Sequence, residues 1–302
     1  MEKTFKTIIP SELPVPKLHH YLLGAVGPRP IAFASTVDEN GVPNLAPFSF
    51  FNVFSANPPI LIFSPARSGR TNTTKDTFNN VKVIPEVVIN IVNFPIVHQM
   101  SLASSPYDPS VDEFQKSGLT PVASETVRPF RVKESPVQFE CKVNEVIELG
   151  QNGGAGNLVI CEVLRMHIDE EIIDDSGQID QHKIDLVARM GGNWYCHANA
   201  ESMFEIEKPI TSCGIGFDAI PSDIKESTVL TANDLGQLGG VEELPDETAV
   251  NEFKLLELSD LFLSLEDNPA ALEKSLHERA KAYLTSNQLE EAWMTLLAFN
   301  NG

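Results

Sequence analysis

The chain has 302 residues, enough to bury the core of one large domain or of a domain with an extension. It carries 42 Asp and Glu against 22 Lys and Arg, and this formal net charge of -20 argues against nucleic acid and anionic membranes as partners, because both would repel it. No apolar run approaches the roughly 20 residues of a membrane-spanning helix, and the first residues lack the pattern of a signal peptide, so we expect a cytoplasmic protein.

The first part of the chain predicts β structure. Large and small side chains alternate over residues 31–36, Asn40-Gly41 supplies a hairpin turn, and an aromatic-rich return strand spans residues 42–53. Asn57-Pro58-Pro59 ends this strand, and the apolar run at residues 60–63 predicts a buried strand. A hairpin and one further strand therefore precede residue 64.

The middle of the chain continues with short helices between strands. We expect helices over residues 75–82 and 94–103, strands over residues 87–92, 137–149 and 158–168, and a Ser-, Pro- and Asp-rich surface excursion over residues 104–135. The glycine cluster at residues 151–156 lacks a GxGxxG or Walker pattern, so it indicates a hairpin tip rather than a phosphate loop. Many turn-separated strands favour a closed or half-closed antiparallel barrel.

The character of the chain changes near residue 205. Proline and glycine mark an irregular segment over residues 206–249, which we expect to pack on the barrel. Leucine and aromatic residues at helical spacing then predict three helices within residues 250–302, with their apolar stripes facing a core. We therefore expect a barrel domain over residues 1–205, an extension over 206–249 and a helical segment over 250–302.

Neither cysteine nor histidine spacing predicts a metal centre. The four cysteines, Cys141, Cys161, Cys196 and Cys213, form no CxxC pair and have apolar or aromatic neighbours, which favours buried, reduced thiols. The seven histidines give no HExxH motif and no Cys/His ligand spacing.

Residues 64–77 form the most informative segment of the sequence. In a chain that is acidic overall, this segment gathers six hydroxyl side chains and three cations, Arg67, Arg70 and Lys75. A strand end, a hydroxyl-rich loop and a helix N-terminus create an anion site, because free backbone N–H groups and the helix dipole favour a phosphate that the cations then neutralise. The alternative is a solvated loop with a helix N-cap at Thr73 or Thr74.

Three pieces of sequence, in this order, resemble the flavin reductase-like, FMN-binding split-barrel family. They are Gly27-Pro-Arg-Pro-Ile-Ala-Phe-Ala-Ser-Thr36, Asn44-Leu-Ala-Pro-Phe-Ser-Phe-Phe-Asn52, and residues 70–80 with Lys75-Asp76-Thr77. Glu134-Ser-Pro136, Phe139-Glu-Cys141 and the pair Arg189 and Tyr195 also resemble later parts of the family pattern. The resemblance covers roughly residues 15–200, and residues 214–236 resemble extensions in longer members.

The resemblance implies a fold, a cofactor and an assembly. The fold is mainly β, an FMN-binding split β-barrel with short helices, to which this chain adds a C-terminal helical extension. FMN is the expected cofactor, with FAD as a further possibility, and NAD(P)H is the expected electron donor. The family is homodimeric with flavin near the subunit interface, which gives a reason for aromatic side chains on an exposed half-barrel. An oxygenase or another electron acceptor is the further partner expected.

The resemblance also implies which residues contact the cofactor. The flavin ring should run along Pro47, Phe48, Ser49, Phe50 and Asn52, because a flat amphipathic ring needs an apolar wall and a few polar contacts. The phosphate should be held by Ser64, Arg67, Arg70, Thr73, Lys75 and Thr77. Ser35 and Thr36 are expected at the ribityl chain or the ring edge, unless they are ordinary strand residues. Arg189 and Tyr195 are expected at the flavin or nicotinamide, unless they belong to a structural strand.

The function expected from these residues is hydride transfer from NAD(P)H to flavin N5 and on to an acceptor. No acid–base pair is required, because the cofactor carries the chemistry. The main alternative is a non-catalytic flavin-binding electron carrier or redox sensor. An interaction module whose acidic helical tail binds a partner, and an activity like that of pyridoxamine-phosphate oxidase on the same broad barrel, are further alternatives. The sequence carries no Rossmann fingerprint that would distinguish NADH from NADPH.

Overall fold

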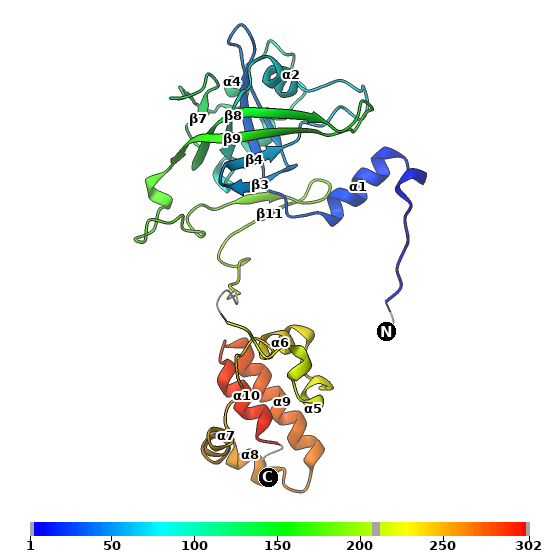
Figure 1. Cartoon of the computed structure of the whole chain (residues 1–302), viewed down its shortest axis with the longest axis vertical. Helices are drawn as coiled ribbons and strands as arrows, with labels where there is room; N and C mark the ends of the chain where they lie inside the picture. Colours follow the sequence, from blue (N-terminus) through cyan, green and yellow to red (C-terminus); the bar gives the residue numbers. More distant parts are fainter. Residues whose placement is uncertain (1–2, 207–211, 300–302) are drawn as a thin grey trace. The chain divides into compact units, whose positions relative to one another are not determined.

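The computed structural model describes residues 3–206 and 212–299 of the chain (Figure 1). The chain divides into two compact units, Met1–Phe204 and Glu205–Gly302. The first unit combines a β-sheet with short helices, whereas the described residues of the second unit form helices and turns only.

Seven strands of the first unit form one antiparallel sheet in the order β2-β1-β5-β8-β9-β4-β3. These strands are β1 (Ala32–Val37), β2 (Pro43–Phe48), β3 (Phe51–Ala56), β4 (Pro59–Phe63), β5 (Glu86–Ile91), β8 (Val137–Glu148) and β9 (Asn157–Ile168). Two short pairs lie outside this sheet, β6 (Pro121–Val122) with β7 (Arg131–Val132) and β10 (Val187–Arg189) with β11 (Tyr195–His197). The antiparallel β8–β9 hairpin crosses the unit as two long ribbons side by side in Figure 1.

The sheet must curl because its two edge strands are consecutive in the chain. β2 and β3 lie at opposite ends of the strand order, yet only Ser49 and Phe50 separate them. Three Cα steps reach at most about 11 Å, so the two edges come together at this point. The sequence analysis expected one continuous strand over residues 42–53, and the structure divides it in two at this connection.

The described helices of the first unit are α1 (Val15–Ala25), α2 (Asp76–Val83), α3 (Val97–Ala103) and α4 (Glu113–Ser117), with short 3-10 turns at Pro10–Glu12, Phe94–Ile96 and Glu170–Ile172. Helices α2, α3 and α4 cover the two faces of β1, whereas α1 has no buried residue. Met100 of α3 and Phe114 of α4 pack with Phe33 in one core cluster, and Val81 of α2 packs with Ala34 in another. The opposite sides follow from strand alternation, since residues 33 and 34 face in opposite directions.

The long excursion between α3 and β8 is fastened to the sheet by buried polar side chains. Asn90 of β5 accepts a hydrogen bond from the Val132 backbone N–H at 2.9 Å. Glu140 of β8 accepts bonds from the backbone N–H groups of Glu125 at 2.9 Å and Thr126 at 2.6 Å. The excursion is therefore held by bonds that its own backbone donates to the sheet, and it contains α4, β6 and β7.

The second unit packs its helices around two apolar clusters. The helices are α5 (Ser222–Lys225), α6 (Ala232–Leu238), α7 (Glu247–Phe253), α8 (Ser259–Ser264), α9 (Pro269–Thr285) and α10 (Leu289–Leu297), with η4 (Phe217–Ala219) and the π-helical turn η5 (Lys254–Leu258). Trp293 of α10 is fully buried and its indole N–H donates to the Leu238 carbonyl at 3.1 Å.

The expected division at residue 249 differs from the observed one. Ile220, Ile224 and Leu235 share a core cluster with Leu284 and Trp293, so the described part of 206–249 forms one unit with the later helices. The physical reason is that short helices bury their apolar faces only by packing against longer ones, and α9 and α10 supply those faces.

Three further observations concern the described residues. None of their helices is long and apolar enough to cross a membrane, and they contain no group of three His, Cys, Asp or Glu side chains placed to hold a metal ion. Cys141 and Cys161 are buried as expected, whereas Cys196 is half-buried and Cys213 is exposed.

Glu140 should make the stability of the sheet depend on acid pH. Its carboxylate is fully buried and also accepts bonds from the Thr126 hydroxyl and from His167 at 2.8 Å. Burial alone would raise the pKa, but the hydrogen bonds from Thr126, Glu125 and His167 outweigh it and lower the pKa of Glu140 from 4.5 to about 2.

We expect Glu140→Gln to remove this pH dependence. A depressed carboxyl pKa stabilises the fold above the unfolded pKa, and this stability, roughly 2–3 kcal/mol, is lost as the pH falls from 4.5 towards 2. Urea unfolding of the wild type should weaken between about pH 5 and about pH 3, and the variant should weaken less over that range. Glu145→Gln, at an exposed site on the same strand, is the control and should behave as the wild type. Equal pH slopes in all three proteins would contradict the role assigned to Glu140.

Candidate functional site

The connection between β2 and β3 is where polar and aromatic groups gather. Phe48, the last residue of β2, packs its ring 5.5 Å from the ring of Phe63 at the end of β4. Phe50 is 40% exposed and meets the His19 ring edge-on at 6.3 Å. The Ser64 backbone N–H donates to the Phe50 carbonyl at 2.9 Å. We call residues 64–75, between β4 and α2, the cationic loop. This loop therefore begins beside the aromatic connection.

Arg67 fixes the shape of the cationic loop. Its Nε donates to the Asn72 side-chain oxygen at 2.8 Å and its Nη2 donates to the Asn72 carbonyl at 2.7 Å. Asn72 lies in the left-handed region with φ of +57°, which asparagine tolerates better than most residues. The Arg67 backbone N–H donates to the Ala155 carbonyl at 2.8 Å. One arginine thus closes the loop on itself and ties it to the hairpin after β8.

The glycine cluster is a hairpin tip, as expected, and it supports the cationic loop. Gly154 donates to the Arg67 carbonyl at 3.1 Å, and the Asn72 side chain donates to the Gln151 carbonyl at 3.0 Å. A Cβ on Gly153 would lie 3.0 Å from the Ser68 carbonyl oxygen, and a Cβ on Gly156 would lie 3.0 Å from Ser64 Oγ. Glycine is therefore needed for the close approach of the two segments.

The remaining polar groups of the loop face solvent. Arg70, Thr73 and Lys75 are exposed, and the hydroxyls of Thr71 and Thr73 are 2.8 Å apart. Ser68 Oγ accepts from the backbone N–H of Thr71 at 3.2 Å. The loop, which is held in place by its backbone contacts, therefore exposes two cations, Arg70 and Lys75, and the hydroxyl pair of Thr71 and Thr73.

The N-terminus of α2 has no side-chain cap. Its N-cap residue is Lys75, and no side chain accepts a hydrogen bond from the N–H groups of the first turn in the described structure. Thr74, which the solvated-loop alternative placed at the N-cap, donates instead to the Asn79 side chain at 2.8 Å. Uncapped first-turn N–H groups beside exposed cations suit a bound anion.

Thr36 and Thr77 lie in the protein interior. The Thr77 hydroxyl donates to the Asn44 side-chain oxygen at 2.8 Å, and Thr36 donates to the same oxygen at 3.3 Å. The Asn44 amide donates to Glu113 at 3.2 Å, and Asn80 donates to Thr36 at 3.1 Å. Burial raises the pKa of Glu113, against the hydrogen bonds from Leu45 and Asn44 that lower it. This network joins α2, α4 and β2 beneath the loop.

Ser35 faces away from this network. It is fully buried on β1, and its hydroxyl has no hydrogen-bond partner in the structure. Strand alternation puts it on the side of β1 opposite to Thr36. The two neighbours that the sequence analysis grouped together are therefore separated by the sheet.

Arg29 organises the other side of the connection. Its Nη1 donates to the carbonyls of Leu23, at 2.8 Å, and Val26, at the end of α1, and its Nη2 donates to the Met190 carbonyl at 2.8 Å. Its Nε lies 3.5 Å from Ser49 Oγ. Burial, together with the nearby charge of Arg189, lowers the pKa of Arg29.

Arg189 and Tyr195 lie together next to this buried arginine. Arg29 and Arg189 exchange backbone hydrogen bonds of 2.9 Å in each direction. The Arg189 guanidinium stacks over the Tyr195 ring at 4.5 Å and donates to the Gly192 carbonyl at 3.0 Å. This corner presents a cation and an aromatic ring beside Ser49.

The structure thus divides the predicted site residues into four groups. Phe50, Ser64, Arg67, Arg70, Thr73 and Lys75 belong to the cationic loop and its start; Ser49, Arg189 and Tyr195 belong to the Arg29 corner; and Ser35, Thr36 and Thr77 are buried. Pro47 and Phe48 are half-buried at the end of β2, and Asn52 is exposed on β3 with its side-chain oxygen accepting from the Val53 N–H at 2.8 Å.

Sequence reasoning gave no role to three residues on which this arrangement depends. Arg29 and Asn44 stood inside the motifs that carried the resemblance, and Asn72 stood inside the cationic segment. Only Asn72 gave a local signal, since asparagine favours left-handed turns. The partners of Arg29 and Asn44 lie far away in sequence, so their roles required the fold.

Comparison with known proteins gives the same family. The sequence profile of the flavin reductase like domain matches residues 25–182. A relative from Halalkalibacterium halodurans is 37% identical over 205 residues, which is 67% of this chain and 96% of that protein.

Solved structures resemble the first unit. Nitrilotriacetate monooxygenase component B from Bacillus cereus has 30% identity and a TM-score of 0.63, covering 68% of this chain and 100% of that one. A putative flavin reductase with a split barrel domain from Shewanella frigidimarina has 28% identity and a TM-score of 0.55, covering 66% and 96%. The expected fold class, a mainly β split barrel with short helices and additional C-terminal helices, is confirmed. The chain belongs to the flavin reductase-like family.

Proposed function

We propose that this protein is a cytoplasmic, FMN-binding flavin oxidoreductase that takes electrons from NAD(P)H and passes them to a separate acceptor. The observation that carries the proposal is the cationic loop, which exposes Arg70 and Lys75, ends with Lys75 at the uncapped start of α2, and begins with a residue that bonds to Phe50. A phosphate site adjoins an aromatic wall there, which is the pair of features that FMN requires.

The phosphate group fits the loop. We assign its charge contacts to Arg67, Arg70 and Lys75 and a hydroxyl contact to Thr73. Backbone N–H groups at the α2 N-terminus would supply hydrogen bonds without rearrangement of the loop, because Arg67 and Asn72 already hold the loop shape. Ser64, Thr36 and Thr77 support this arrangement from beneath, since Ser64 accepts from the Asn157 N–H and the two threonines bond to Asn44.

The flavin ring fits the surface over the β2–β3 connection. Pro47, Phe48 and Phe50 offer an apolar wall, while Ser49 and Asn52 offer polar contacts to the ring edge. Arg29 connects Ser49 to Arg189, because its side chain reaches Ser49 and its backbone bonds to Arg189. We assign Arg189 and the neighbouring Tyr195 to contacts with the nicotinamide or the flavin edge. FAD remains compatible with the same set, because its phosphate nearest the ring would use the same cations.

The reaction needs little from the chain beyond binding and orientation. The redox chemistry, hydride transfer from NAD(P)H to flavin N5 and electron transfer to an acceptor, would be supplied by the flavin when it is bound. The residues of the loop would hold the anionic end of the flavin, and those of the β2–β3 connection would hold its ring. We do not assign any residue as a proton donor, because hydride transfer between the two cofactors does not require one.

A homodimer fits the exposed edge of the sheet. β3 is an edge strand, and its Val53 and Phe54 side chains are both 63% exposed. An exposed apolar edge strand is a liability for a monomer, so a partner surface is expected to cover it. Because Asn52 lies on the same strand, the flavin would sit near that interface.

An oxygenase is the acceptor that the comparisons favour. The similar structure from Bacillus cereus is described as component B of nitrilotriacetate monooxygenase. By analogy we propose that reduced flavin from this chain serves a separate oxygenase.

The phosphate assignment predicts a selective loss of affinity. Arg70→Ala combined with Lys75→Ala should weaken FMN binding by roughly 10- to 100-fold, since each charge-assisted contact contributes about 1 kcal/mol or more. Binding of riboflavin, which lacks the phosphate, should change little. Fluorescence quenching of the two flavins measures both. Lys142→Ala, an exposed cation on β8, is the control. An unchanged FMN affinity in the double variant would refute the assignment.

The reductase function predicts bleaching of bound flavin by a nicotinamide donor. The purified protein with FMN should lose its flavin absorbance on anaerobic mixing with NADH or NADPH, and the faster donor identifies the physiological one. Stopped-flow absorbance measures the rate. Flavin that binds but is bleached by neither donor would favour the electron carrier or sensor function. If no flavin bound, the proposal that FMN is the cofactor would be wrong.

The dimer proposal predicts coupled loss of assembly and cofactor. Val53→Asp with Phe54→Asp should halve the mass found by sedimentation and weaken FMN binding at least several-fold, because charges on an apolar interface are costly to bury. Leu102→Asp, also at an exposed apolar site, is the matched control. A variant that stays dimeric would show that another surface forms the interface.

A further inference from the structure

The stretch from α7 to α8 is apolar on two faces. One face contributes Val250, Leu258 and Leu261 to the core of the second unit. The other exposes Leu255, Leu256 and Leu263 at 73%, 79% and 72%. A helix that is apolar on two faces is suited to two neighbours, and among the described residues 212–299 of this unit only the first face is covered.

The π-helical turn η5 creates this second face. Phe253 and Leu258, five residues apart, both pack into the same core cluster. A regular α-helix would rotate one of them out, whereas the wider π turn keeps both inside and leaves Leu255 and Leu256 between them on the outside. Such turns inside helices occur frequently at functional sites.

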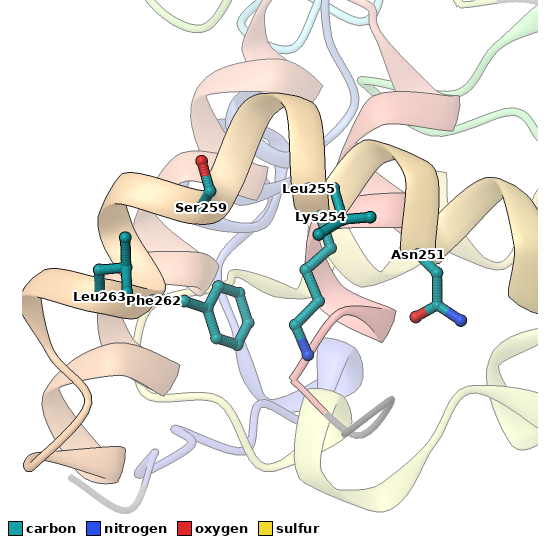
Figure 2. A pocket seen from close by; sticks show the side chains of 6 residues that line it. All are labelled: Asn251, Lys254, Leu255, Ser259, Phe262 and Leu263. Carbon is teal, nitrogen blue, oxygen red and sulfur yellow. The ribbon is translucent and has the colours of Figure 1, made fainter.

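Two of the exposed leucines, Leu255 and Leu263, border a hollow of about 460 Å³. Its lining is Asn251, Lys254, Leu255, Ser259, Phe262 and Leu263, and its walls are mostly apolar. Figure 2 shows the Lys254 chain and the Phe262 ring facing each other across it, with the Lys254 ammonium 4.3 Å from the ring centre. We call this surface, together with the neighbouring Leu256, the leucine groove.

The surroundings of the leucine groove are strongly acidic. Residues 242–267 carry nine Asp and Glu and one cation, Lys254, whose ammonium lies over the Phe262 ring. Glu252 and Asp260 are exposed on either side of η5, and Glu257 lies 3.8 Å from Arg279. An apolar groove with an acidic rim selects an apolar ligand with basic flanks.

We propose that the leucine groove docks an amphipathic helical segment of a partner protein, with leucine-like side chains on one face and Lys or Arg on its flanks. Three exposed leucines accept the apolar face in the helix-in-groove manner, and Glu252 and Asp260 pair with the basic flanks. The acidic rim disfavours anionic lipid and a second copy of the same groove, because both would place like charges together.

A synthetic peptide tests the proposal on the full chain. The probe is a fluorescent leucine–lysine amphipathic helix of about 18 residues, and the controls are a scrambled peptide of the same composition and a leucine–glutamate version. Fluorescence anisotropy should show saturable binding of the first peptide, and at least tenfold weaker binding of both controls.

Two sets of variants locate the binding. Leu255→Gln with Leu256→Gln and Leu263→Gln should weaken binding by roughly 10- to 100-fold and leave the circular dichroism spectrum unchanged, because all three side chains are exposed. Glu252→Gln with Asp260→Gln should weaken it several-fold and reduce its salt dependence. Glu290→Gln, an exposed carboxylate on α10, is the control for charge.

Three results would overturn the proposal. Equal binding of the ordered and scrambled peptides would mean simple charge attraction. Wild-type affinity in the leucine triple variant would place the contact elsewhere. Self-association of the full chain that disappears in the triple variant but persists in Val53→Asp with Phe54→Asp would mean that a second copy fills the groove.

Discussion

The two-residue connection between β2 and β3 is the constraint on which the first unit depends. Two strands at opposite ends of a seven-stranded order are separated only by Ser49 and Phe50, so the sheet has to curl until its edges meet. The barrel stays open beyond that point because, in the described structure, the sheet order pairs β2 with β1 and β3 with β4 only. A split of this kind brings loops from both edges to one place, where Ser64 reaches Phe50 and Arg29 reaches Ser49.

The local chemistry of the site follows from how this connection is held. The Arg29 guanidinium donates hydrogen bonds to backbone carbonyls from α1 and from the β10–β11 turn. It therefore holds these two segments together instead of pairing with a carboxylate. Arg67 likewise shapes the cationic loop, because its Nε and Nη2 donate to Asn72, and it keeps its positive charge for the proposed phosphate contact. Arg70 and Lys75 are exposed on the loop that Arg67 holds in shape, so an anion bound there would have to order these two side chains but not the loop backbone.

Much of this was predictable from residue patterns, and the rest was not for identifiable reasons. Alternation and turn residues located most of the strands, and the mixture of cations and hydroxyls located the loop. The division of residues 42–53 at Ser49 was missed because aromatic residues continue through it without a glycine or an acidic turn. Thr77 looked equivalent to Thr73 in sequence, yet one lies under Asn44 and the other faces solvent, since strand and helix packing decide which hydroxyls turn inward. Ser35 and Thr36 were separated by the two-residue period of the strand alone.

The charge of the chain is also unevenly divided. The described residues 212–299 hold 17 Asp and Glu against 5 Lys and Arg, so this stretch carries 12 of the 20 net negative charges. The first unit is correspondingly less acidic, so its other charges reduce the positive potential of the cationic loop less than an evenly acidic chain would. The acidic second unit is unsuited to binding FMN, because its charge would repel the phosphate. Its Leu255, Leu256 and Leu263 side chains are exposed to solvent rather than buried in a core. The acidic charge and exposed leucines of the second unit therefore favour a partner that is basic and apolar. The cationic loop of the first unit favours an anionic ligand.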